Sequence, residues 1–193
     1  MQNFRESDAA PEKVAFVTKL EDIIGGVTVA AADFTNGAII PAGSVIGKDG
    51  NGLYHVLKTA RLHTAASNTA TDYLVLKGHG FKVGDFIAAL TGAKAYAITA
   101  INTSNADYDT ISVGTTLGVA ISQYAGVFQA LAEATSNTSA FKVAPSAVIG
   151  HSLELKTGDT NVVDAWLRAT LIEANVPVVT PQIKAALPQI LWV

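Results

Sequence analysis

The chain has 193 residues, enough for one hydrophobic core of ordinary size or two small ones. Its net charge of −3 argues against a nucleic-acid-binding surface, and the absence of cysteine excludes disulfides, thiolate metal sites and thiol nucleophiles. Charged residues make up only 15% of the chain, against about 25% in an average domain, so we expect other subunits to cover part of its surface.

Residues 1–24 mix charged, proline and isolated apolar positions without a sustained period, which predicts an extended N-terminal arm. Residues 1–8 lack a basic region followed by an apolar run, so we expect no secretory route. Later apolar stretches are all interrupted well before the roughly 20 residues that cross a bilayer. We therefore expect no membrane segment.

From Gly25 the pattern changes to short β-branched runs that are closed by turn residues. Asn36-Gly37 is a tight-turn signal, because both residue types tolerate positive φ. The glycine-rich segment 48–52 lies between two short apolar runs and predicts a hairpin. We assign residues 25–61 to a β base domain.

Small polar residues dominate segments 62–71 and 132–139, and we expect both to be linkers. Short strands and turns alternate between them; Thr110–Val113, for example, alternates polar and apolar residues as a half-buried strand does. Strands of this length and spacing predict a small barrel or sandwich. Residues 62–139 therefore read as an inserted small β module with flanking linkers.

Residues 140–193 return to the base domain. Segment 162–172 fits one face of a helix and one face of a strand, and we favour a strand. Thr180 and Pro181 predict the start of a helix of about two turns, and the apolar end Ile190–Val193 predicts a closing strand or a contact with another chain. The expected fold class is mainly β: small β-barrel or sandwich domains, an extended N-terminal arm and one short C-terminal helix.

The residues that carry chemistry in enzymes are scattered. The histidines, His55, His63, His79 and His151, show no metal-ligand spacing, and the carboxylates form no pair in an apolar context. We therefore expect no catalytic residue, no cofactor and no metal. The enzymatic alternative is a hydrolase on a β scaffold that uses His79 and Asp85, but the sequence places no nucleophile and base together.

Two blocks of sequence carry a family pattern. Ala38–Gly47 leads into the glycine-rich hairpin, and Ala165–Pro177 is followed by the short helix through Ile183 and by the end Ile190–Val193. In these blocks, which span about half of the chain, it resembles phage capsid-decoration and head-fibre proteins; residues 73–131 do not match. The resemblance implies a non-enzymatic structural virion protein, made in the host cytoplasm. It would bind the major capsid protein on the capsid surface as a homo-oligomer, with a trimer favoured.

The resemblance also indicates where contacts with other copies or the capsid would lie, namely on apolar residues of the arm and the C-terminus: Phe4, Val14, Phe16, Ile190, Leu191, Trp192 and Val193. The alternative function is a carbohydrate-binding or adhesin-like β module whose aromatic rings stack on sugars: Tyr54, Tyr73, Tyr108, Tyr124, Trp166 and Trp192. Aromatic residues total only 7%, and most occupy core-like positions, which favours the structural virion protein.

Overall fold

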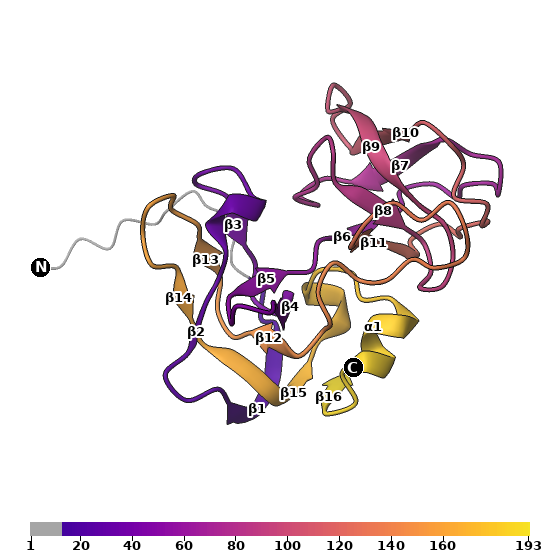
Figure 1. The fold of residues 1–193 in the computed structure, drawn as a ribbon. Helices are drawn as coiled ribbons and strands as arrows, with labels where there is room; N and C mark the ends of the chain where they lie inside the picture. The colour runs from indigo at the N-terminus through magenta and orange to yellow at the C-terminus, as the bar shows by residue number, and fades with distance from the viewer. Residues whose placement is uncertain (1–12) are drawn as a thin grey trace, which may run out of the picture.

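The computed structural model describes residues 13–193, and this part of the chain is mainly β with one short α-helix near the C-terminus, as the sequence predicts. Two six-stranded sheets dominate the molecule and occupy separate regions of Figure 1. Neither sheet of the described residues closes on itself, so the architecture is sandwich-like and the predicted barrel alternative is wrong.

The first sheet takes its strands from both ends of the chain. In spatial order the strands are β1 (Phe16–Asp22), β15 (Ala165–Leu171), β12 (Ala147–Ile149), β4 (Val45–Lys48) and β5 (Tyr54–Val56), with β16 (Ile190–Trp192) also paired to β15. All neighbours are antiparallel except β15 and β16. Strand β15 confirms the strand that we favoured within 162–172, and β4 and β5 confirm the hairpin at 48–52.

Two small strand pairs complete this half of the molecule. Strand β3 (Ile39–Ile40) pairs with β13 (Leu153–Glu154), and β2 (Val27–Thr28) pairs with β14 (Val162–Val163). The predicted turn at Asn36-Gly37 is present, with Gly37 at a φ of 79°. It does not join two paired neighbours, because β2 and β3 each pair with the C-terminal half of the chain.

The predicted arm ends earlier than expected, because residues 16–22 form strand β1. The start of this strand is anchored to the rest of the protein. Ala15 is buried in the core, and the amide of Ile172, just after β15, donates to the carbonyl of Ala15 at 2.8 Å. The irregular pattern that suggested an arm has a structural cause, since the pairing of β1 with β15 shifts register three times.

The second sheet is formed by one continuous stretch of chain. In spatial order its strands are β6 (Thr59–Arg61), β11 (Gly126–Ala130), β8 (Phe86–Ala88), β9 (Ala95–Asn102), β10 (Tyr108–Val113) and β7 (Asp72–Leu76). Its two edge strands approach each other at a single bridge between Leu62 and Val75. The segments expected to be linkers pack onto this sheet, because Ala66 bridges Ile121 and Ala134 bridges Ala95.

Helix α1 (Pro181–Ala186) begins as predicted. The Thr180 hydroxyl accepts a hydrogen bond from the Ile183 amide at 3.3 Å, and Pro181 occupies the first turn, where it costs no hydrogen bond. There are also two short 3-10 turns: Ala31–Asp33 between β2 and β3, and Glu173–Asn175 between β15 and α1.

The core that α1 completes joins the two sheets. Ile183 of the helix and Ile190 of β16 share one cluster with Leu171 of the first sheet and Phe128 of the second. In Figure 1 the helix lies between the two sheets. A second cluster fills the second sheet, and a third lies on the opposite side of the first sheet, around Ile46 and Ile149. The two sheets are therefore parts of one packed body.

Candidate assembly interface

Strand β1 is the edge of the first sheet and has no neighbour on its outer side among the described residues. All six residues from Val17 to Asp22 are exposed. Two of them are large and apolar, Val17 and Leu20, the latter 67% exposed. The turn after the strand carries Ile24, which is 95% exposed. Exposed apolar side chains along the edge of a sheet form a surface that another molecule can contact.

The one lysine of this strand does not protect the edge, although charged residues usually do. The Lys19 ammonium donates to the Gly150 carbonyl at 2.8 Å and lies 3.5 Å from the Asp164 carboxylate. It also sits over the rings of Phe16 and Trp166, 4.6 and 5.2 Å from their centroids. The lysine charge is thus directed back onto the sheet, and the exposed edge carries Val17 and Leu20 together with the acidic residues Glu21 and Asp22.

Asp164 organises this corner of the sheet. It accepts from the Trp166 indole at 2.8 Å and contacts the His151 ring. Partial burial alone would raise the pKa of Asp164, but the Trp166 hydrogen bond, His151 and Lys19 together lower it. Gly150 is required here, because a β-carbon at this position would overlap the carboxylate of Asp164 and the indole of Trp166.

The C-terminal strand β16 lies along the opposite edge of β15. Its end is fixed by two backbone hydrogen bonds: the Val193 amide donates to Leu171 at 2.9 Å, and the Glu173 amide donates to Val193 at 2.8 Å. Ile190 is buried, whereas Leu191 and Val193 are about 60% exposed. The first sheet therefore has exposed apolar side chains at two different edges.

The predicted contact residues divide into two groups. Val14, Leu191 and Val193 are exposed, as a contact role requires, and Phe4 lies outside the described residues. Three others face the protein's own core: Ile190 is buried there, and Phe16 and Trp192 pack against it. For these three, the apolar character that suggested an interface is used within the chain.

Sequence reasoning missed Val17, Leu20 and Ile24, because they fell in the segment expected to be an arm. A signal for them existed. Together with Val14 they recur every three or four residues across a segment that is otherwise polar or charged.

Two charged residues beside the second sheet, Lys58 and Asp85, form a buried ion pair rather than an exposed site. The Lys58 ammonium donates to Asp85 at 2.8 Å and lies over the Phe34 ring, and Gln129 donates to the other Asp85 oxygen at 2.9 Å. Burial lowers the pKa of Lys58, and Asp85 opposes that shift. Both oxygens of Asp85 are already satisfied by structural partners.

His79 is paired with a different carboxylate from the one that the hydrolase alternative requires. Its Nδ1 accepts from the Phe81 amide at 3.0 Å, and its Nε2 lies 3.4 Å from Asp109. Burial lowers the pKa of His79, against the effect of Asp109. Among residues 13–193, no three histidine, aspartate or glutamate side chains are grouped so that they could hold a metal ion.

Within residues 13–193, no helix has the length and apolar character needed to cross a membrane. Comparison with known proteins gives no match for this chain among family models, curated proteins or solved structures.

Proposed function

We propose that this chain is a non-enzymatic structural subunit of a phage-type virion, which forms a homotrimer and binds the outer surface of the capsid. The observation that carries the proposal is the exposed apolar edge of the first sheet, from Val17 to Ile24. The pattern of Ala38–Gly47 and Ala165–Pro177, which resembles decoration and head-fibre proteins, supplies the virion context.

The arrangement of the apolar edges favours a ring. One set of exposed side chains lies on β1 and the other on β16, and these strands flank β15 on opposite sides. A contact between the β1 edge of one copy and the β16 edge of the next joins unlike surfaces. Repeated contacts of this kind close into a cyclic assembly when the rotation permits, and a trimer is the smallest such ring.

The contact is made by side chains rather than by a continuous sheet across subunits. The three register shifts in β1 disturb the regular spacing of backbone groups that an added strand needs. Full burial of the exposed side chain of Leu20 or Ile24, in contrast, makes the free energy of association more favourable by about 2 kcal/mol each. Burial of these side chains in the neighbouring copy supplies the specificity of the contact.

The trimer is tested by measuring the molar mass of the purified chain by size-exclusion chromatography with light scattering. We expect about three times the chain mass of 20.0 kDa, and about one chain mass for Leu20→Lys, which places a charge in the contact. Val83→Lys is the matched control, because Val83 is similarly exposed but lies outside the first sheet. A monomeric wild-type chain, or a trimer that survives Leu20→Lys, would contradict the proposal.

The capsid role is tested by sedimentation with shells assembled from the major capsid protein of the encoding virus. We expect the wild-type chain to sediment with the shells at a fixed ratio and Leu20→Lys to sediment much less, since a trimer binds the lattice through several weak contacts at once. A trimer that stays in the supernatant would overturn the virion role while leaving the assembly intact.

A further inference from the structure

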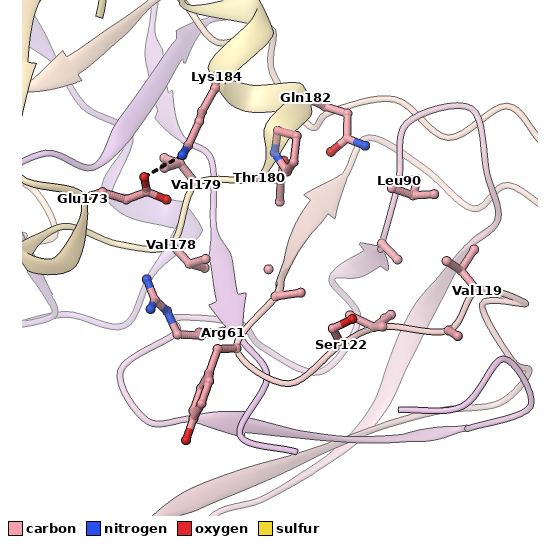
Figure 2. Close-up of a pocket in the computed structure, with 17 residues that line it drawn as sticks. Arg61, Leu90, Val119, Ser122, Glu173, Val178, Val179, Thr180, Gln182 and Lys184 are labelled. Atoms are coloured by element: carbon pink, nitrogen blue, oxygen red, sulfur yellow. Dashed lines mark hydrogen bonds and ion pairs between the residues drawn. The ribbon is translucent and has the colours of Figure 1, made fainter. Parts of the chain in front are cut away.

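A cavity of about 470 Å³ lies where the C-terminal segment crosses the second sheet. In Figure 2, Leu90, Val119 and Ser122 line one side, and Val178, Thr180 and Gln182 line the other. Small-molecule sites in proteins usually measure roughly 300 to 1,000 Å³, so the space fits a ligand of one or two sugar rings.

Close packing fixes the C-terminal segment that forms one wall of the cavity. Gly126 of β11 lies under the C-terminal segment, and a β-carbon there would be 3.0 Å from Val178 and 3.1 Å from Thr180. On the other side of the segment, Lys184 of α1 forms an ion pair with Glu173 at 2.6 Å. The C-terminal segment is therefore packed closely on β11 at the cavity and is tied to α1 by this ion pair.

Two polar groups in this cavity have no partner within residues 13–193. The Arg61 guanidinium has neither a hydrogen bond nor an ion pair, and the Gln182 side-chain oxygen is buried without a hydrogen-bond donor. Buried polar atoms are almost always paired in native proteins. The Gln182 oxygen is such an unpaired buried atom, and the Arg61 guanidinium, at a partly exposed residue, offers N–H donors to a ligand in the cavity.

Tyr124 lines the same cavity in an unusual conformation. Its φ of 64° makes it the one non-glycine residue with positive φ in the described part of the chain. The turn is held by the Tyr124 amide, which donates to Leu62 at 2.9 Å. A bulky residue is strained in this region, where glycine is not, and such strain gathers at functional sites. The ring is also 57% exposed and free to stack on a ligand.

We propose that this cavity binds a saccharide that carries a carboxylate, of the uronic or sialic acid class. Arg61 takes the carboxylate through paired N–H donors, and the tyrosine ring covers an apolar face of the sugar. Lys184 is neutralised by Glu173, so Arg61 leaves the cavity with a net single positive charge, which matches one carboxylate better than a phosphate ester.

The other aromatic residues considered for sugar stacking are less available. Tyr73 is fully buried, with its hydroxyl bonded to Ala70, and Tyr54, Trp166 and Trp192 pack against core clusters. Tyr108 is partly covered and stacks against His63, with ring centroids 5.0 Å apart. The strained tyrosine is thus the ring of this set that combines exposure with a cavity.

The test is a titration of the full chain with N-acetylneuraminic acid and with methyl glucuronide, followed by amide chemical shifts in NMR spectra. We expect saturable shifts in segments 119–126 and 178–184 with at least one acid, and a weaker or absent response to methyl glucoside, which lacks the carboxylate. No response to either acid, or an equal response to the neutral glucoside, would overturn the proposal.

Two variants separate binding from folding. Arg61→Gln should weaken the bound acid by about 10- to 100-fold, while Arg168→Gln, at an exposed arginine on the first sheet, should leave it unchanged. Tyr124→Gly removes the stacking ring, so we expect weaker binding, by up to about tenfold. It also relieves the positive-φ strain, so the melting temperature should not fall. Unchanged binding in Arg61→Gln would contradict the proposal. Neither result bears on the trimer.

Discussion

The edge strands of the two sheets differ in how far their residues are exposed. In the second sheet, Leu62 and Val75 bridge the two edge strands, and both side chains are fully buried. In the first sheet, β1 exposes every residue from Val17 to Asp22. The edges of the second sheet are therefore covered by its own chain, whereas the first sheet keeps exposed apolar side chains along β1.

The charged residues follow the same division. At the second sheet, Lys58 and Asp85 form a buried pair, with the lysine side chain 1% exposed. At the edge of the first sheet, Glu21 and Arg168 lie 3.8 Å apart and are more than half exposed. Ion pairs that water reaches contribute little, and buried ones are costly to break. Substitutions in the two regions should therefore differ widely in effect.

The largest effect is expected from Lys58→Ala, which leaves the Asp85 carboxylate buried without its cation. We expect the free energy of unfolding to fall by about 3–5 kcal/mol, measured by urea denaturation at one fixed protein concentration. The control is Lys82→Ala, whose ammonium donates, within residues 13–193, only to the Ala32 carbonyl at 3.4 Å. Equal effects of the two substitutions would show that the buried pair is not the stabilising element.

A second effect at the same sheet depends on pH. His79 is buried and its pKa is lowered, so the folded state holds the ring neutral while the unfolded chain protonates it below about pH 6.5. Stability from this residue is complete above that pH and is lost as the pH falls towards the folded pKa, by up to about 1.4 kcal/mol per pH unit.

This pH dependence is measured by chemical denaturation between about pH 7.5 and 5. His79→Asn keeps an acceptor for the Phe81 amide and has no titrating ring, so its stability should change less over this range. The Asp164 pKa is lowered from an already acidic value, so its own contribution is lost only at more acidic pH. An unchanged slope in His79→Asn would contradict the assignment.

A smaller effect is expected where the two sheets meet, at the start of α1. Thr180→Ala removes the side-chain acceptor for the Ile183 amide and should lower the free energy of unfolding by about 1 kcal/mol. Thr180→Ser keeps the hydroxyl and should restore most of the loss. If serine and alanine destabilised the protein equally, the lost methyl group rather than the cap would be responsible.

The features that the sequence predicted are those set by neighbouring residues. Thr180 and Pro181 define the start of α1, and the glycine-rich segment 48–52 defines a hairpin, because capping and turn preferences act over a few positions. Strand β1 was missed because its register shifts break the alternation by which strands are recognised. The distant pairing of β2 with β14 leaves no local signal.

Of the residues expected at a contact, Leu191 and Val193 are exposed, whereas Trp192 packs against the core of its own chain. An apolar strand end does not reveal which side chains face inward until the strand has a partner. The cavity was beyond sequence reasoning, since Arg61 and Gln182 line one cavity only after the second sheet and the C-terminal segment pack together.

The smallest effects on stability are expected at the exposed edge itself, where two charged contacts should differ in their contribution. Lys19 has four partners there, the Gly150 carbonyl, Asp164 and two aromatic rings, whereas Glu21 has, among the described residues, only Arg168 at 3.8 Å. We expect Lys19→Ala to lower stability by about 0.5–1 kcal/mol and the Glu21–Arg168 pair to contribute less than about 0.5 kcal/mol in a double-mutant cycle.

Both measurements belong in the Leu20→Lys background, so that subunit contacts do not enter the unfolding free energy. A coupling energy for Glu21 and Arg168 as large as the effect of Lys19→Ala would mean that this edge is shielded from solvent even in the separated chain. That result would weaken the argument for an uncovered edge, because an exposed pair at this distance gains almost nothing in water.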